Sequence, residues 1–341
     1  MKKMLALLLA LVMVLSLAAC ASSQPAAAST ETAETTEAAE PAAEAPAESG
    51  KTYTVGVCQL VQHEALDAAT QGFIDALKEE LGDAVTVDVQ NASGDSVNCG
   101  TIVNGFVSKG VDLIMANATP ALTAAVSATA DIPILGTSIT AYGVALDIDD
   151  FNGTVGGNVS GTSDLADLQA QAQMILDWFP ETKTVGLLFC SAEPNSRYQI
   201  DEVRKALEAQ GVTCEEFAFT DSNDVSSVTQ KAADFSDVVY IPTDNTAASN
   251  TEAIANVLIP AGVPAVCGEE GLCRGCGVAT LSISYYDLGV TTGKMAAKIL
   301  KGEADISTMP VEYTDATPKY NASVCEQLGI TPLDGYEAID G

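Results

Sequence analysis

The 341-residue sequence is poor in basic and aromatic residues, and it contains a single histidine, His63. It has 15 lysines and arginines against 46 aspartates and glutamates, which gives a formal net charge of −31 at pH 7. This surplus of negative charge disfavours nucleic acid or an anionic membrane surface as a partner. With one histidine, at most one histidine-based acid/base pair can form, and the nucleophile-elbow, P-loop and dinucleotide-binding glycine patterns are absent. We therefore expect a protein that is not an enzyme, with no catalytic residue, no cofactor and no metal.

Aromatic residues make up 5% of the chain. Binding sites for sugars and nucleosides usually stack a ring on aromatic side chains. The composition disfavours such a ligand, although a sugar or nucleoside binder stays open as an alternative.

The first residues have the pattern of an export signal. Lys2 and Lys3 precede an apolar run that ends in Leu17-Ala18-Ala19-Cys20. The run is too short for a stable membrane-spanning helix, and small residues precede the cysteine, as in a bacterial lipobox. We expect residues 1–19 to be a lipoprotein signal peptide and Cys20 to be lipidated, which would anchor the protein at the extracytoplasmic face of the bacterial cell membrane.

Residues 20–50 are predicted to be a disordered tether behind that anchor. After Cys20 the segment contains no aromatic, basic or large aliphatic residue, so it cannot bury enough apolar surface to fold.

The sequence contains nine cysteines, and close spacing occurs at Cys273 and Cys276. A single C-x-x-C without a second pair or a nearby histidine is weak evidence for zinc. It favours a local disulfide or two free thiols.

From residue 51 onward, apolar strand-like runs alternate with helical periodicity. Runs such as YTVGVCQL, VDLIMA, VGLLF and VVYI are each followed by an amphipathic stretch, and the series restarts after a glycine- and asparagine-rich break over 147–160. Repeated β-α units with nearly continuous apolar strands predict parallel sheets covered on both faces. The fold class predicted is α/β, with two doubly wound parallel-sheet lobes.

Ligands of open parallel sheets bind beyond the carboxyl ends of the strands. The loops that follow the apolar runs are all polar, and they differ between the two halves. The first half supplies amides, hydroxyls and the histidine, and the second supplies three carboxylates with two amides. This combination suits a zwitterion such as an amino acid, with its ammonium on Asp244 or Glu269, although helix capping explains any one of these residues equally well. The candidate ligand-binding residues are Gln62, His63, Thr119, Ser138, Glu193, Asn195, Asp244, Asn245 and Glu269.

Several long stretches resemble a known family. QLVQHEALDAATQGF, NATPALTAA, VSGTSDL, CSAEPNSRYQ, IPTDNTAAS and ATLSISYYDLGVTTGKMA, spread over both halves, are similar to ABC transporter substrate-binding lipoproteins of the tryptophan/tyrosine-binding type. This sequence departs from the family pattern at Glu64, where proline is expected after the histidine.

The resemblance implies the two-lobed fold of type I periplasmic binding proteins, whose lobes close on one solute by a hinge motion. It implies that residues 51–158 and 284–308 form the N-terminal lobe, and that 159–283 and 309–336 form the C-terminal lobe. It also implies an amino-acid ligand, an aromatic one, and an ABC permease with its ATPase as partners. We expect a monomer. A receptor that presents its ligand to a membrane sensor stays open as an alternative function.

Overall fold

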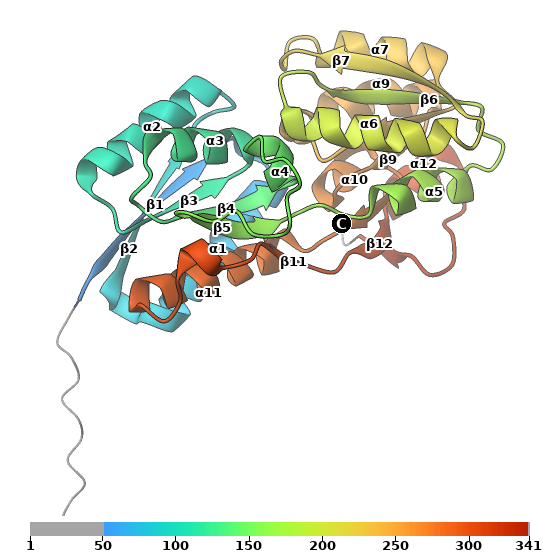
Figure 1. The fold of residues 1–341 in the computed structure, drawn as a ribbon. Helices are drawn as coiled ribbons and strands as arrows, with labels where there is room; N and C mark the ends of the chain where they lie inside the picture. The colour runs from blue at the N-terminus through green and yellow to red at the C-terminus, as the bar shows by residue number, and fades with distance from the viewer. Residues whose placement is uncertain (1–50, 340–341) are drawn as a thin grey trace, which may run out of the picture. The chain divides into compact units, whose positions relative to one another are not determined.

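Two β-sheets carry the fold of residues 51–339, the part of the chain that the computed structural model describes (Figure 1). The signal peptide, the lipidation of Cys20 and the tether were predicted for residues that lie outside this range. The two sheets repeat one strand order, β2-β1-β3-β4-β5 in the first and β7-β6-β8-β9-β10 in the second.

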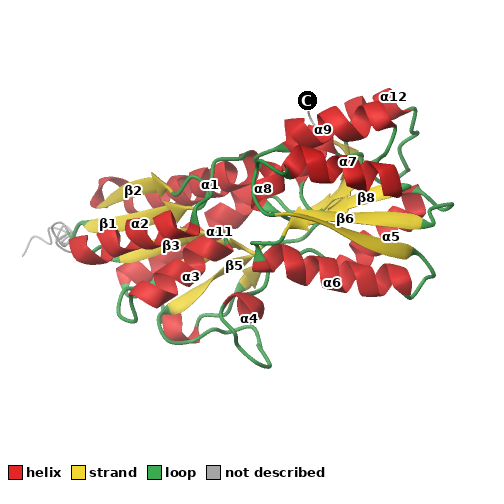
Figure 2. Ribbon diagram, turned by 90° about the horizontal axis from the view of Figure 1, so that it is seen from above, coloured by secondary structure: helices red, strands yellow, loops and turns green. Residues whose placement is uncertain are grey.

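The first sheet is parallel throughout, with the order β2-β1-β3-β4-β5-β11. Its strands are β1 (Tyr53–Gln59), β2 (Val85–Asn91), β3 (Leu113–Asn117), β4 (Ile134–Ile139), β5 (Val159–Ser163) and β11 (Glu312–Tyr313). Figure 2 shows helices on both faces, namely α2 (Ser96–Lys109) and α3 (Thr119–Ala128) on one and α1 (Glu64–Leu81) and α11 (Tyr285–Lys301) on the other. With α4 (Tyr142–Ala145) and the 3-10 turns η1 (Gly82–Ala84) and η2 (Ile306–Thr308), these elements form the first lobe.

The second sheet has the order β7-β6-β8-β9-β10-β12-β13, and β12 runs antiparallel to β10. Its strands are β6 (Thr184–Cys190), β7 (Thr213–Phe219), β8 (Val238–Ile241), β9 (Ala265–Cys267), β10 (Ala279–Ser282), β12 (Thr317–Tyr320) and β13 (Glu337–Ala338). One face packs on α5 (Leu168–Trp178), α6 (Pro194–Glu208) and α12 (Ala322–Leu328), and the other on α7 (Val225–Phe235), α9 (Thr251–Ala261) and α10 (Glu270–Cys276). With the short helix α8 (Asn245–Ala248), these elements form the second lobe.

The central strands are apolar because both of their faces are covered. Every residue of β3 and β8 is buried, and an apolar cluster lies on each side of each sheet. The prediction of an α/β fold with two doubly wound parallel-sheet lobes is confirmed.

The chain crosses between the lobes three times, at segments that we call the hinge connections. Residues 164–167 lead from β5 to α5, residues 283–284 lead from β10 to α11, and residues 314–316 lead from β11 to β12. The second crossing returns α11 to the first lobe, where it packs on α1. A side chain at Gly289 would overlap the carbonyl oxygen of Ala69, so glycine permits this close helix packing.

The predicted lobe boundaries are wrong at two strands. Residues 159–163 and 312–313 were assigned to the C-terminal lobe, but β5 and β11 pair in the first sheet. Helix α5 of the second lobe begins only at Leu168, after the crossing at residues 164–167. The strand β5 escaped detection because it buries small polar residues instead of an apolar run. The hydroxyl of Thr162 lies 3.2 Å from that of Thr137 and 2.8 Å from that of Thr292.

Eight cysteines lie in residues 51–339, and the structure has them as free thiols, including Cys273 and Cys276. Within the same range, no helix has the length and apolar character needed to span a bilayer. No group of three or more His, Cys, Asp and Glu side chains in the described residues is arranged to hold a metal ion.

Candidate functional site

The carboxyl ends of strands from both sheets border a cleft between the lobes. An inner pocket in this cleft is lined by residues at or just after the carboxyl ends of β1, β4 and β5 in the first sheet and of β6, β8, β9 and β10 in the second. About 10 Å³ of the inner pocket is open to a water molecule, which is room for about one.

Most of the predicted ligand-binding residues meet at this cleft. Six of them line the inner pocket, namely His63, Ser138, Asn195, Asp244, Asn245 and Glu269. Glu193 and Asn245 also line a larger outer cavity of about 380 Å³. Gln62 is exposed and Thr119 is buried, and neither lines the inner pocket or the outer cavity.

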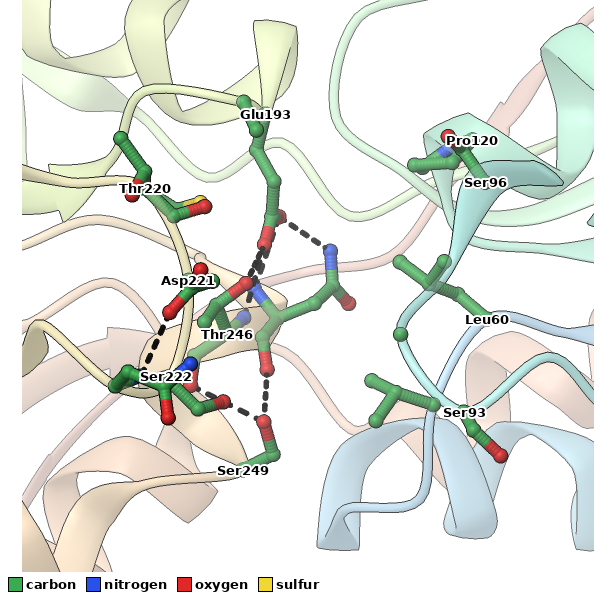
Figure 3. A pocket seen from close by; sticks show the side chains of 16 residues that line it. Leu60, Ser93, Ser96, Pro120, Glu193, Thr220, Asp221, Ser222, Thr246 and Ser249 are labelled. Atoms are coloured by element: carbon green, nitrogen blue, oxygen red, sulfur yellow. Dashed lines mark hydrogen bonds between the residues drawn. The ribbon is translucent and has the colours of Figure 1, made fainter. Parts of the chain in front are cut away.

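The outer cavity lies between the two lobes, and residues of both lobes line it (Figure 3). Leu60, Ser93, Ser96 and Pro120 form its first-lobe wall. The second-lobe wall is mostly polar. It includes the carboxylates of Glu193 and Asp221, the amides of Asn223 and Asn245, and the hydroxyls of Thr220, Ser222, Thr246 and Ser249. Because the inner pocket and the outer cavity share Asn245, they adjoin one another.

The carboxylate of Glu193 is occupied by the start of helix α8. Its Oε2 accepts hydrogen bonds from the backbone N–H of Asn245 at 3.0 Å and from Nδ2 of the same residue at 2.7 Å. Its Oε1 accepts from the backbone N–H and the hydroxyl of Thr246, at 2.9 and 2.8 Å. Glu193 therefore fixes a loop of the second lobe at the edge of the pocket.

Asp244 and Glu269 are N-caps of the helices that follow them. Asp244 accepts from the backbone N–H of Ala247 at 2.8 Å and of Cys190 at 2.6 Å, and Glu269 accepts from Gly271 at 2.7 Å and Leu272 at 2.5 Å. Both side chains are buried, with Asp244 1% and Glu269 2% exposed. Burial raises the pKa of Glu269 to about 7, and burial together with the negative charge of Glu193 raises the pKa of Asp244.

His63 connects the two lobes through its ring. Its Nε2 lies 3.2 Å from Oδ1 of Asn245, whose Nδ2 donates to Glu193, so Oδ1 is the acceptor and Nε2 carries the proton. Burial lowers the pKa of His63, which favours the neutral ring and leaves a lone pair on Nδ1. The neighbouring residue, Glu64, makes a second contact between the lobes, with a carboxylate oxygen 3.3 Å from the guanidinium of Arg274.

Four buried polar atoms around the inner pocket have no hydrogen-bond partner within residues 51–339. They are Nδ1 of His63, Oγ of Ser138, Oδ1 of Asp164 and Oδ1 of Asn195. Buried polar atoms in proteins are nearly always paired, so several unpaired atoms at one pocket mark a place where a ligand or water binds. One water molecule donates two hydrogen bonds, so it cannot satisfy Nδ1 of His63 and Oδ1 of Asp164 and Asn195, which all accept.

Backbone strain also lies on the first-lobe side of the cleft. Ser138 has φ 55°, at a point where the register of β4 against β5 shifts, and Ala118 has φ 86° at the start of α3. A residue other than glycine costs free energy in this region, and such residues are concentrated at functional sites. Ser138 lines the inner pocket and is 6% exposed.

The inner pocket also contains residues that the sequence did not single out as ligand-binding. Thr140, Asp164, Thr243 and Tyr285 line it, and Tyr285 donates its hydroxyl to Oδ2 of Asp164 at 2.9 Å. Asp164 lies in the stretch VSGTSDL, directly after β5. Recognising 159–163 as a strand would have placed Asp164 among the strand-end residues.

Comparison with known proteins gives consistent matches over the globular part. A family model described as ABC transporter substrate binding protein matches residues 54–335. A tyrosine-binding protein of Clostridioides difficile (strain R20291) is 32% identical over 276 residues, which cover 79% of this chain and 79% of the relative.

Two solved structures are similar to this chain over most of its length. An ABC domain from Streptococcus pneumonia in complex with L-Trp is 32% identical, covers 84% of this chain and 100% of that chain, and has a TM-score of 0.80. A ligand-free, open structure of a substrate binding protein with adhesive properties from Clostridium difficile is also 32% identical, with 85% and 99% covered, and its TM-score is 0.65.

Proposed function

Because the chain belongs to the family of ABC transporter substrate-binding proteins, we propose that it binds a free amino acid between its lobes and delivers it to an ABC permease. Proteins of this family bind small molecules, work outside the cytoplasm and in general catalyse no reaction. The ligand that we propose is an aromatic amino acid, tyrosine or tryptophan.

The observation that carries this proposal is the set of unpaired polar atoms around the inner pocket. Both lobes contribute to it, with His63 and Ser138 from the first and Asn195 from the second. A zwitterion offers donors on its ammonium and acceptors on its carboxylate, so it can satisfy several of these atoms at once. Asp164, which lines the pocket with one unpaired carboxylate oxygen, favours a ligand that brings positive charge.

The outer cavity offers room for the ligand's side chain. Its volume of about 380 Å³ is in the range of small-molecule sites. Leu60, Val61 and Pro120 supply an apolar wall, and hydroxyl and amide groups face them. This mixed lining suits a ring that carries a polar group, and Tyr285 is the aromatic residue among the described residues that line the pocket or the cavity.

Entry of the ligand requires the lobes to separate, because about 10 Å³ of the inner pocket is open. The three hinge connections are the segments about which such a motion occurs. Contacts of one ligand with both lobes stabilise the closed form by the difference in its affinity for the two forms. In this mechanism the ligand contacts His63, Ser138, Asn195 and Asn245. A ligand contact of Gln62 or Thr119 stays a prediction, since neither residue lines the pocket or the cavity.

A binding screen tests the proposal. Saturating ligand at about 100 times its Kd stabilises the folded protein by about 2.7 kcal/mol, so a thermal-shift panel of the amino acids, with sugars and nucleosides as comparison, identifies the ligand class. We expect a shift with tyrosine or tryptophan and 1:1 binding by calorimetry. A shift with a sugar or nucleoside and with no amino acid would contradict the proposal.

Delivery to a permease and the lipid anchor are tested in cells. Deletion of the gene should abolish high-affinity uptake of the labelled amino acid, whereas uptake that is unchanged would favour a sensory receptor. Cys20→Ala should release the protein from the membrane fraction. If the Cys20→Ala variant stays acylated and membrane-bound, Cys20 is not the anchor.

A further inference from the structure

We propose that Asp164, at the carboxyl end of β5, binds the ammonium group of the ligand and makes the site select amino acids over acids that lack the amine. This inference rests on the proposed function and names a residue for it. It replaces the expectation that Asp244 or Glu269 receives the ammonium.

The hydrogen bonds of the pocket's carboxylates distinguish Asp164 from the others. Both oxygens of Glu193, Asp244 and Glu269 accept hydrogen bonds from the second lobe's own backbone and side chains. Asp164 is 5% exposed and receives the hydroxyl of Tyr285 on Oδ2, while its Oδ1 has no partner in the part of the chain that the structure describes. An unpaired carboxylate oxygen in a buried pocket is the strongest acceptor that the cleft offers to a cation.

Two further unpaired acceptors line the same pocket. Asn195 donates Nδ2 to the backbone oxygen of Thr243 at 3.2 Å, which leaves its Oδ1 as the unpaired acceptor. His63 donates through Nε2, which leaves the lone pair of Nδ1. An ammonium group has three N–H donors, which matches a set of one carboxylate oxygen, one amide oxygen and one ring nitrogen.

The position of Asp164 couples this contact to closure. It is the first residue of the hinge connection 164–167, directly after the last residue of β5. Asn195 lies on α6 of the second lobe, and His63 precedes α1 of the first. An ammonium bound to all three therefore links the hinge with both lobes.

The charge state of Asp164 supports the assignment. Burial raises its pKa to about 6, so the group is mainly ionised at pH 7.5 and mainly protonated at pH 5. The titratable groups that share the pocket are His63, whose pKa burial lowers, and the buried carboxyl groups of Asp244 and Glu269, whose pKa values are raised. Glu193 and Tyr285 border the same space, and Tyr285 keeps its proton because burial raises its pKa.

The test compares each amino acid with its analogue that lacks the amine. Calorimetry is run with L-tyrosine and L-tryptophan, and with 3-(4-hydroxyphenyl)propionate and 3-(indol-3-yl)propionate. For the wild type we expect the amino acid to bind at least tenfold more tightly than its analogue. In Asp164→Asn, a charge-assisted hydrogen bond is lost, so affinity for the amino acid should fall by about ten- to a hundredfold. Affinity for the analogue should change less than threefold.

Glu269→Gln is the matched control, because it neutralises another buried carboxyl of the same pocket. We expect it to lower the melting temperature and to keep the preference for the amine. Tyr285→Phe is a second control, since it removes the partner of Oδ2 and retains the charge of Asp164. The Tyr285→Phe variant should therefore still bind the amino acid at least tenfold more tightly than the analogue that lacks the amine.

The outcomes separate this inference from the proposed function. If the wild type binds no amino acid, the proposed function fails. If the wild type binds an amino acid and Asp164→Asn keeps the same affinity and preference, Asp164 is not the ammonium site and the function stands. Should Asp164→Asn fail to fold, calorimetry of the wild type at pH 6 in buffers of different ionisation enthalpy replaces it. Proton release on binding L-tyrosine is expected there, and no proton exchange would overturn the assignment.

Discussion

The two lobes share a strand order but differ in how their helices begin at the cleft. In the second lobe, Glu193, Asp244 and Glu269 each bind backbone N–H groups at the start of a helix. In the first lobe, His63 and Ala118 precede α1 and α3 without forming a side-chain cap, and Asp95 caps α2 at the outer cavity. The second lobe's three carboxylates at the pocket therefore hold the starts of α8 and α10 in that lobe.

This difference changes the interpretation of the pocket's charge. The asymmetry between the halves was expected to mark an ammonium site on Asp244 or Glu269. The capping alternative explains both residues, and the carboxylate with an unpaired oxygen is Asp164 at the hinge. The second lobe's acids stabilise that lobe, and the unpaired atoms shared by both lobes are the ones available to a ligand.

The pH dependence of stability gives the largest expected effect. The folded-state pKa values of Asp164 and Glu269, about 6 and 7, lie above the unfolded values near 4, so the folded state binds more protons between them. Their contribution to stability is full below about pH 4 and is lost as pH rises through 6 to 7, on the order of a few kcal/mol.

The melting temperature of the ligand-free protein should therefore fall between pH 5 and pH 8, as followed by circular dichroism. Glu269→Gln should reduce this fall. If the wild type melts at the same temperature across this range, these groups are not buried and protonated in the folded protein.

Removal of a second-lobe cap gives the next largest effect. Asp244→Ala leaves the backbone N–H groups of Cys190 and Ala247 without their acceptor, so the free energy of unfolding should fall by about 1–3 kcal/mol. Asp244→Asn keeps an acceptor oxygen and should lose less. Urea denaturation measures both variants, and an unchanged stability of Asp244→Ala would show that the capping role is wrong.

His63→Ala should act on binding more than on stability, because the His63 side chain caps no helix and its ring makes one hydrogen bond, to Asn245. The variant loses the hydrogen bond to Asn245 and the acceptor Nδ1, so amino-acid affinity should fall about tenfold, which is 1.4 kcal/mol. Calorimetry at pH 7.5 checks this. Equal affinity with the wild type would exclude His63 from the ligand site.

The ion pair between the lobes should give the smallest effect. Glu64 and Arg274 are partly exposed, with side chains 51% and 36% accessible, so Glu64→Gln should weaken ligand binding by about 0.2–1 kcal/mol at low salt. The difference should vanish in high salt. Lys205→Gln, which breaks an ion pair within α6, is the control and should leave affinity unchanged at both salt concentrations. A Glu64→Gln effect that persists in high salt would contradict a screened ion pair.

The sequence predicted those parts of the fold that depend on apolar patterning. Alternating apolar strands and amphipathic helices were sufficient for the two doubly wound lobes, since strands such as β3 and β8 are buried on both faces. The same criterion failed at β5, where hydroxyl pairs such as Thr162 with Thr292 replace apolar contacts. The lobe boundary was misplaced for that reason.

The sequence was sufficient to predict which residues lie at the pocket, but not what each of them does there. Reading the loops after each strand located His63, Ser138, Asn195 and Asn245 at one pocket. Which acid caps a helix and which keeps an unpaired oxygen depends on hydrogen bonds between distant segments, such as Cys190 with Asp244. Asp164 was missed because the strand before it was missed.

A crystal structure of the protein grown with L-tyrosine tests the central claim most directly. We expect the amino acid between the two lobes, with its ammonium nitrogen at about 2.8–3.0 Å from Oδ1 of Asp164 and within hydrogen-bond distance of Asn195 and His63. Asp244 and Glu269 should still cap α8 and α10. A ligand bound outside the cleft, or an ammonium that rests on Asp244 or Glu269 while Oδ1 of Asp164 stays unpaired, would contradict it.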